Sequence, residues 1–203
     1  MIAGYNRIVS GFSPREMLEF FITRYEGKIT FSTSLGAEDQ VLTDMICSID
    51  RGTRFFTLDT GRLFQEIYDL LQVTEKKYGI RINVYFPDAS KVENMVKEHG
   101  INLFYESVEN RKLCCEIRKI EPLKRALAGM EIWFTGLRRE QSVTRTELKA
   151  VEWDEAYGVI KVSPLIDWTE AQVWAISGET KSPITICTTK VIRASGACPA
   201  QSL

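Results

Sequence analysis

Two kinds of segment alternate along the chain, and they differ in the spacing of their apolar residues. Short runs of β-branched and aromatic residues are typical of buried strands, and longer runs with apolar residues three or four positions apart are typical of amphipathic helices. The predicted strands begin at Ile29, Thr53, Ile80, Glu131 and Val159, and the predicted helices cover 13–25, 38–46, 63–78, 91–99, 120–127 and 167–174. Strands that alternate with helices predict an α/β fold with a doubly wound, mostly parallel sheet.

Composition narrows the class of protein. The 203 residues suit one domain, and 26 basic residues nearly balance 27 acidic ones without forming a charge block, so we expect no nucleic-acid partner. No apolar run is long enough to cross a bilayer, and the N-terminal residues do not resemble a signal peptide, so we expect a cytoplasmic protein without a membrane partner. The composition is compatible with a homo-oligomer.

The stretch from Ile29 to Val41 predicts an anion site. A strand is followed by a turn rich in hydroxyl groups and then by a helix, whose first N–H groups and positive dipole end attract anions. The expected ligand-binding residues of this turn are Ser32, Thr33, Ser34 and Gly36. The same pattern also fits an ordinary β–turn–α corner.

A second turn and several cations belong to the same edge of the predicted sheet. Because ligands of doubly wound sheets bind beyond the carboxyl ends of the strands, the turn after the strand at Thr53 should lie beside the first turn. This turn supplies Leu58, Asp59, Gly61 and Arg62, and further cations follow in or beside later loops at Lys119, Arg138, Arg139 and Arg145. Single cations of this kind usually lie on a solvated face, but guanidinium groups that converge on an anion site predict an acidic small molecule, and a nucleotide fits best.

The cysteines indicate reduced thiols. Five cysteines, with Cys114 and Cys115 adjacent, do not suit a secreted disulfide framework. The neighbouring cations favour thiolates at this pair, and thiolates bind soft metals and iron–sulfur clusters. A cluster needs two further ligands, and Cys187 and Cys198 stand too far apart to form a second close pair. Spacing alone therefore argues against a cluster.

Five stretches together resemble the assimilatory adenylyl-sulfate / phosphoadenylyl-sulfate reductase family. They are Phe31–Leu42, Leu58–Arg62 with Glu66 and Tyr68, Cys114–Leu123, Thr135–Arg145 and Ser163–Trp174. The resemblance implies an adenine-nucleotide α-hydrolase-like (PP-loop) fold. It also implies reduction of adenylyl sulfate (APS) to sulfite and AMP in sulfate assimilation, with thioredoxin or glutaredoxin as the electron donor.

The resemblance also implies roles for residues. The double cysteine is similar to that of the branch that carries a [4Fe-4S] cluster and prefers APS to phosphoadenylyl sulfate (PAPS), so Cys114 and Cys115 would be two of its metal ligands. The nucleotide would lie on the two turns, the arginines would hold sulfate or phosphate oxygens, and Lys119 would lie near cluster and sulfate. The family's other two ligands form a Cys-x-x-Cys motif further on, and its nucleophile is a cysteine near the C-terminus.

After Trp174 the resemblance ends, and the genetic code suggests why. In the adjacent reading frame, the codons of residues 190–201 can spell Gly-Tyr-Pro-Ser-Ile-Gly-Cys-x-Pro-Cys-Thr, which is the family's cluster motif. We therefore expect a family domain at 1–174 and an out-of-frame tail at 175–203, in which Cys187 and Cys198 have no role. A chain without the two ligands and the nucleophile is expected to bind APS weakly and to be catalytically defective.

Two other functions stay open from the residues. A PAPS reductase of the same family stays open, because the double cysteine is the only feature of this chain that discriminates between the two substrates. An ATP-dependent adenylyltransferase of the PP-loop type is a weaker fit, because its turn usually reads Ser-Gly-Gly-x-Asp-Ser, whereas this chain has Ser34-Leu35-Gly36-Ala37-Glu38-Asp39.

Overall fold

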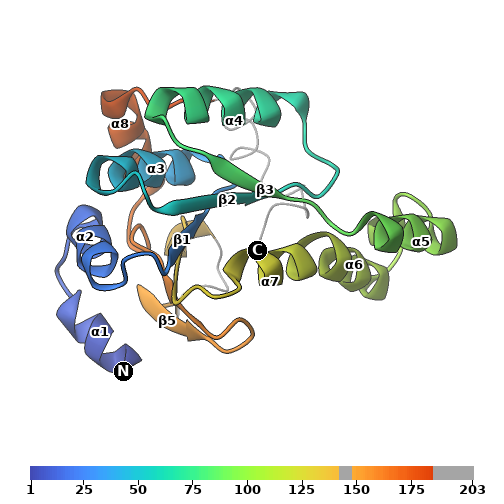
Figure 1. Ribbon diagram of the computed structural model, residues 1–203, viewed down its shortest axis with the longest axis horizontal. Helices are drawn as coiled ribbons and strands as arrows, with labels where there is room; N and C mark the ends of the chain where they lie inside the picture. Colours follow the sequence, from blue (N-terminus) through green and yellow to red (C-terminus); the bar gives the residue numbers. More distant parts are fainter. Residues whose placement is uncertain (142–147, 185–203) are drawn as a thin grey trace.

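A single mixed sheet forms the centre of the molecule in the computed structural model, which describes residues 1–141 and 148–184 (Figure 1). Its six strands follow the order β3-β2-β1-β4-β6-β5. The strands are β1 (Ile29–Ser32), β2 (Arg54–Leu58), β3 (Ile82–Tyr85), β4 (Ile132–Phe134), β5 (Val151–Asp154) and β6 (Val159–Val162). Every pairing is parallel except that of β5 with β6. The predicted doubly wound sheet is confirmed, and the strand order reverses between β1 and β4, where such sheets bind ligands.

Helices cover both faces of the sheet. They are α1 (Ile2–Ile8), α2 (Pro14–Arg24), α3 (Ala37–Ile49), α4 (Gln65–Tyr78), α5 (Ala89–His99), α6 (Val108–Cys115), α7 (Glu121–Leu127) and α8 (Glu170–Thr180), with a π-helical turn at Glu116–Ile120 and 3₁₀ turns at Leu103–Tyr105 and Arg139–Gln141. Figure 1 shows α3, α4 and α8 together on one side of the sheet, and α6 and α7 on the other.

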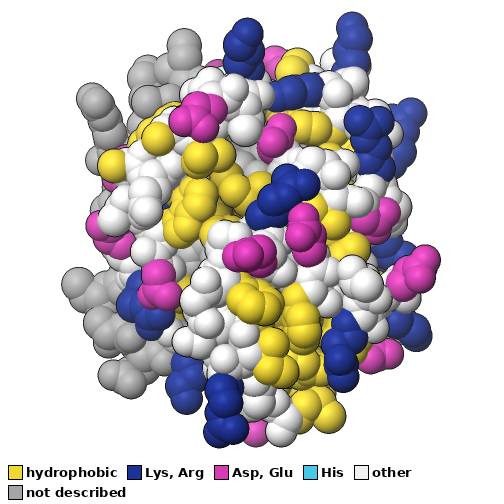
Figure 2. Space-filling model, turned by 90° about the vertical axis from the view of Figure 1, so that its left-hand side faces the viewer, with side chains coloured by type: hydrophobic (Ala, Val, Ile, Leu, Met, Phe, Trp, Pro, Cys, Tyr) yellow, Lys and Arg dark blue, Asp and Glu magenta, His cyan; other side chains and the backbone are white. Residues whose placement is uncertain are grey.

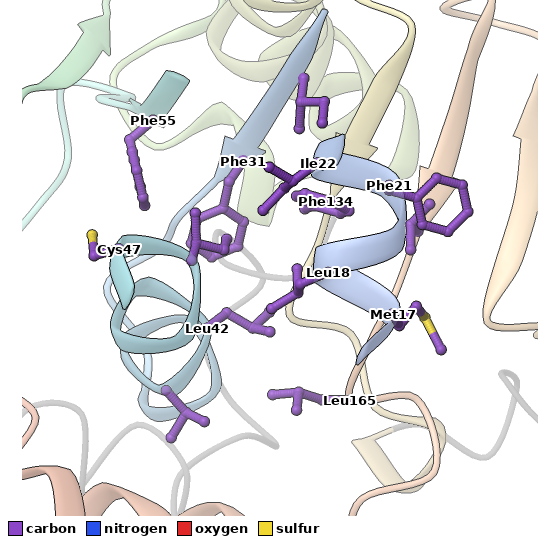
Figure 3. Close-up of a cluster of buried hydrophobic side chains, with 14 of the residues drawn as sticks. Met17, Leu18, Phe21, Ile22, Phe31, Leu42, Cys47, Phe55, Phe134 and Leu165 are labelled. Carbon is purple, nitrogen blue, oxygen red and sulfur yellow. The ribbon is translucent and has the colours of Figure 1, made fainter. Parts of the chain in front are cut away.

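The strands bury both faces, which explains their continuous apolar runs. Phe31 and Phe55 lie opposite each other in register and pack edge to face, with ring centroids 5.7 Å apart, in the larger core beneath α2 and α3 (Figure 3). The next residue of β2, Phe56, points to the opposite face and packs with Leu123 and Trp133. Because side chains alternate between the two faces of the sheet, β2 contributes to the cores on both faces.

The first predicted helix begins where α2 begins, whereas the last one is predicted to begin at 167 and α8 begins at Glu170. Ser13 and Glu16 form a capping box at the start of α2, where the helix predicted over 13–25 begins. At α8 the cap is Thr169 with Gln172. The helix continues past Trp174 to Thr180, where Lys77 Nζ donates to the carbonyl oxygens of Thr180 (3.0 Å) and Lys181 (2.8 Å).

The pattern of apolar residues misses α1 and β5, which stabilise each other. The side-chain amide of Asn6 in α1 donates to the carbonyl oxygen of Val151 (2.7 Å) and accepts from its N–H (3.2 Å). This amide therefore pairs with the exposed edge of β5, where a further strand would otherwise add.

The described helices and one face of the molecule bear on membrane and charge interactions. None of the helices in the described ranges is long and apolar enough to cross a bilayer. On the face drawn in Figure 2, basic and acidic side chains are interspersed between two apolar patches.

Replacing Phe31 should test the larger core. Phe31 is fully buried, so Phe31→Ala removes its ring contacts and leaves a cavity, and we expect a loss of about 3–5 kcal/mol in the free energy of unfolding. Phe86 is 56% exposed, so Phe86→Ala should change that free energy by less than about 0.5 kcal/mol. Urea denaturation measures both, and equal losses would contradict the assigned core.

Candidate functional site

The turn between β1 and α3 lies at the strand-order reversal, and its hydroxyl groups have partners within the chain. Ser32 Oγ accepts from Trp133 Nε1 (2.8 Å), and Thr33 Oγ1 accepts from the N–H of Leu35 (2.9 Å). Leu35 has a φ of 61°, a conformation that favours glycine, and its side chain is fully buried. Gly36 is the N-cap of α3. The turn is therefore a tightly bonded structure rather than an open row of donors.

Asp39 holds this turn closed. Its Oδ2 accepts from both the N–H (2.6 Å) and the Oγ (2.7 Å) of Ser34, and the residue is 8% exposed. Burial raises the pKa of the Asp39 carboxyl to about 6 against the lowering effect of the two Ser34 bonds, and the neighbouring Glu38 carboxylate raises the pKa further. The two donors that the sequence assigns to a ligand at Ser34 are thus occupied by a side chain of α3.

Asp39 also explains the glycine after β4. A Cβ atom on Gly136 would lie 2.1 Å from Asp39 Oδ1, far inside van der Waals contact. Only glycine lets the loop after β4 pass so close to the N-terminus of α3. Sequence inspection noted neither role, although the Glu38-Asp39 pair in the first turn of the helix and the Thr135-Gly136 pair directly after a strand are recognisable signals.

A buried ion pair ties the same loop to α3. Arg138 is 3% exposed, and its Nε donates to Glu38 Oε1 at 2.9 Å. Gln141 Nε2 donates to the same oxygen (3.0 Å), and Arg138 Nη1 also donates to Glu140 Oε2 (2.8 Å). Glu140 Oε2 in turn accepts from the N–H of Glu170 at the start of α8 (3.0 Å). Arg138 therefore joins three elements, and its charge is compensated by carboxylates.

Two other predicted cations are also bonded within the chain. Arg139 donates to Asp167 Oδ1 (2.7 Å) and to the carbonyl oxygen of Leu148. Arg62 donates to the carbonyl oxygen of Ile101 (2.9 Å) and to Asn102 Oδ1 (3.0 Å), and its guanidinium lies 4.6 Å from the ring centroid of Phe104. Arg145 lies outside the described residues. Arg62, Arg138 and Arg139 thus each brace a loop within the chain.

The turn after β2 is built around Asp59. This residue is 1% exposed, and its carboxylate accepts from the N–H of Gly61 (2.7 Å) and from the hydroxyl of Tyr68 (2.6 Å). The bond to Asp59 raises the pKa of the Tyr68 hydroxyl. Leu58, at the end of β2, is partly buried. Because β2 pairs with β1, the two predicted turns are neighbours, as expected.

A pocket opens on the other side of this turn, where α6 meets α7. The π-helical turn Glu116–Ile120 interrupts the helix directly after the cysteine pair, and such turns are frequent at functional sites. The pocket is lined by Thr60, Arg62, Phe104, Arg111, Cys114, Cys115, Arg118 and Lys119. Arg118 and Lys119 are each 6% exposed, so two cations are buried beside two thiols.

Arg118 lines the pocket but is not among the site residues predicted from the sequence. Its Nη1 donates to the carbonyl oxygen of Thr60 (2.6 Å), which fixes the turn after β2, and its buried Nε has no hydrogen-bond partner among the described residues. A buried donor without a partner is costly unless a ligand or water satisfies it. Cys114 is buried and Cys115 is partly exposed, both as free thiols.

The cysteine pair supplies half of the ligands that a [4Fe-4S] cluster requires. Within residues 1–141 and 148–184, no group of three or more His, Cys, Asp or Glu side chains could hold a metal ion. Cys47 is buried in the core on α3, and Cys187 and Cys198 lie outside the described residues. The described thiols fit a cluster edge beside cations but do not complete a site.

Acidification should reveal the Asp39 carboxyl. Its pKa of about 6 in the folded chain exceeds the ordinary value of 3.8, so the native state binds the proton more tightly than the unfolded state. Wild type should therefore lose up to about 3 kcal/mol of stability relative to Asp39→Asn as the pH rises from about 4 to about 6. Urea denaturation across this range measures the difference. Asp69→Asn, on the exposed face of α4, should track wild type; parallel curves for wild type and Asp39→Asn would contradict the assignment.

Removing one partner of the buried ion pair should lower the free energy of unfolding more than removing both partners. Arg138→Met leaves the Glu38 carboxylate buried without its cation, and we expect a loss of about 3–5 kcal/mol in unfolding free energy. The double variant Glu38→Met/Arg138→Met should recover most of that loss, because no buried charge remains. Additive losses in this double-mutant cycle would show that the two side chains do not depend on each other.

Comparison with known proteins agrees with this geometry. The model of the phosphoadenosine phosphosulfate reductase domain matches residues 28–188. Adenosine 5'-phosphosulfate reductase of Allochromatium vinosum is 51% identical over 162 residues, which are 80% of this chain and 63% of that protein. The Burkholderia cepacia enzyme of the same name is 52% identical over 148 residues, covering 73% of this chain and 59% of its own length. The chain thus spans less than two thirds of these curated relatives.

Solved structures give the same result for the fold. Phosphoadenylyl-sulfate (PAPS) reductase from Candida auris, in a phosphate complex, superposes with a TM-score of 0.77 and 27% identity over 96% of this chain and 90% of that one. FMN adenylyltransferase from Candida glabrata reaches a TM-score of 0.54 at 16% identity over 80% of this chain and 54% of its own, so it shares the fold alone. With a mostly parallel six-stranded sheet, PP-loop-like neighbours and a family model that matches most of its length, the chain belongs to the phosphoadenosine phosphosulfate reductase family.

Proposed function

We propose that this chain is the nucleotide-binding part of an adenylyl-sulfate reductase of sulfate assimilation. The observation that carries the proposal is the pair Cys114-Cys115 beside the buried cations Arg118 and Lys119, at the edge of the sheet where ligands bind. Relatives that are 51% and 52% identical carry the name adenosine 5'-phosphosulfate reductase. Because the chain is also similar in structure to PAPS reductase from Candida auris, PAPS is the alternative substrate for this chain.

The nucleotide would lie between the two turns that the sequence singles out. Ser32, Thr33, Ser34 and Gly36 would form one wall, and Leu58, Asp59, Gly61 and Arg62 the other. Because Lys119 lines the pocket with the thiols, it is the predicted cation best placed for the sulfate group. Arg138 and Arg139, which bond to carboxylates, would brace the loop after β4 beside the ligand.

The proposed chemistry is thiol-dependent reduction. In the intact family member, a cysteine thiolate from the tail that the proposed frameshift replaces attacks the sulfur of APS; the bond from sulfur to the phosphate oxygen breaks, and AMP leaves with its electron pair. The resulting thiosulfonate is reduced by the dithiol of thioredoxin or glutaredoxin, which becomes a disulfide as sulfite leaves. Arg118 and Lys119 would stabilise the negative charge of the leaving phosphate. A [4Fe-4S] cluster would be held in part by Cys114 and Cys115, in the same pocket as Lys119. Such chemistry suits the reducing cytoplasm.

We also propose that residues 175–203 are read out of frame. The adjacent frame can encode the family's Cys-x-Pro-Cys motif across 190–201, and a long match of this kind is improbable by chance. The boundary falls within α8, which continues from Trp174 to Thr180.

Sequencing of the gene and a sulfite assay test both proposals. The chain as given should release no sulfite from APS above a blank without enzyme, even with thioredoxin. A gene with the frame restored near the codon of Ala175 should produce a protein that absorbs visible light through its cluster and releases sulfite. Cys115→Ser in that restored protein should abolish the absorbance.

Three results would contradict these proposals. Sulfite release by the chain as given would show that the nucleophile is not missing. DNA that does not encode Gly-Tyr-Pro-Ser-Ile-Gly-Cys in the adjacent frame would refute the frameshift. Release of pyrophosphate from ATP would favour the adenylyltransferase class over the reductase.

A further inference from the structure

We propose that Asp39 is a specificity-determining residue that closes the β1–α3 turn to phosphate groups and thereby excludes nucleotides with a polyphosphate tail. A turn of this type ordinarily offers its N–H and hydroxyl donors to a phosphate. Here both Ser34 donors are bonded to one carboxylate oxygen of Asp39, at 2.6 and 2.7 Å. The carboxylate thus occupies the place that an anionic ligand would take.

Charge strengthens the exclusion. The adjacent Glu38 is compensated by Arg138, but Asp39 has no ion-pair partner in the described part of the chain. A phosphate that approached the Ser34 donors would meet an uncompensated negative charge at hydrogen-bond distance, and like charges at such a separation repel strongly in a buried site.

The turn cannot easily rearrange to admit both anions. Asp39 Oδ1 faces Gly136, where even a Cβ atom would approach to 2.1 Å, so the carboxylate is confined between two backbone segments. Leu35, at the centre of the turn, holds its left-handed φ of 61° with a fully buried side chain. Rotation of Asp39 away from Ser34 would therefore require the loop after β4 to move.

With the β1–α3 turn closed, the acidic groups of the ligand would lie against Arg118 and Lys119. The buried residues Arg118 and Lys119 line the pocket beside the turn after β2, and Arg118 Nε has no hydrogen-bond partner among the described residues. A nucleotide with a short acidic tail can place that tail there while its nucleoside lies near β1. A triphosphate, with a longer and more highly charged tail, would have to extend onto the closed turn or leave the site. This step rests on the proposed nucleotide site.

Neutralising Asp39 should open the turn. Isothermal titration of pyrophosphate, ATP and AMP into the full chain compares wild type with Asp39→Asn and Asp39→Ser. Both variants should bind pyrophosphate and ATP at least about tenfold more tightly than wild type, since the negative charge at the turn is removed and Asp39→Ser also frees the two Ser34 donors, whereas AMP affinity should change less than about twofold. Asp69→Asn changes the net charge equally on the exposed face of α4 and should leave all three affinities unchanged.

The outcomes separate the inference from the proposed function. If AMP binds and neither Asp39 variant gains affinity for pyrophosphate or ATP beyond Asp69→Asn, the inference is wrong while the nucleotide site stands. If AMP fails to bind any form but the Asp39 variants gain pyrophosphate affinity, the inference stands and the proposed nucleotide site is wrong. A cooperative urea transition is required of each variant, and Asp39→Ser, which is smaller, serves if Asp39→Asn does not fold.

Discussion

One buried carboxylate, that of Asp39, sets the geometry at the point where the strand order reverses. It satisfies the turn donors at Ser34, and it leaves room for nothing larger than glycine at position 136. The adjacent Glu38 binds Arg138 and thereby anchors the loop after β4. Two acidic residues in the first turn of α3 therefore position the β1–α3 turn and the loop after β4. Since these two segments carry negative or compensated charge, we propose that an acidic ligand is attracted by the buried cations beside the cysteine pair.

Much of the fold could be predicted because its strands are short, continuous apolar runs separated by helices with clear caps. The run around Phe31 and the Ser13 cap illustrate this, and each agrees with the structure. The edge strand β5 could not be found in this way, since Val151-Glu152-Trp153-Asp154 is brief and half polar. Its stability depends on distant contacts, including the amide of Asn6, and such contacts leave no periodic signal.

The sequence predicts which loops are neighbours better than it predicts the bonds between their side chains. The turns after β1, β2 and β4 lie at one edge because parallel strands end together, which spacing alone implies. The bonding partners of Glu38 and Asp39 could not be inferred from the sequence, because acidic residues are common at helix N-termini. In the structure Glu38 forms an ion pair with Arg138, and Asp39 accepts hydrogen bonds from Ser34. The value of Arg118 depends on the π-helical turn that buries it, and this turn has no marker in the sequence.

A crystal structure of the full chain with AMP would test the central claim directly, namely that the β1–α3 turn is closed by Asp39 and that the acidic end of the ligand lies against Arg118 and Lys119. The account predicts a nucleotide at the β1–β4 crevice with the bonds from Ser34 to Asp39 intact and the phosphate in the pocket beside the cysteine pair. A phosphate bonded to the N–H and Oγ of Ser34, with the Asp39 side chain displaced, would contradict it.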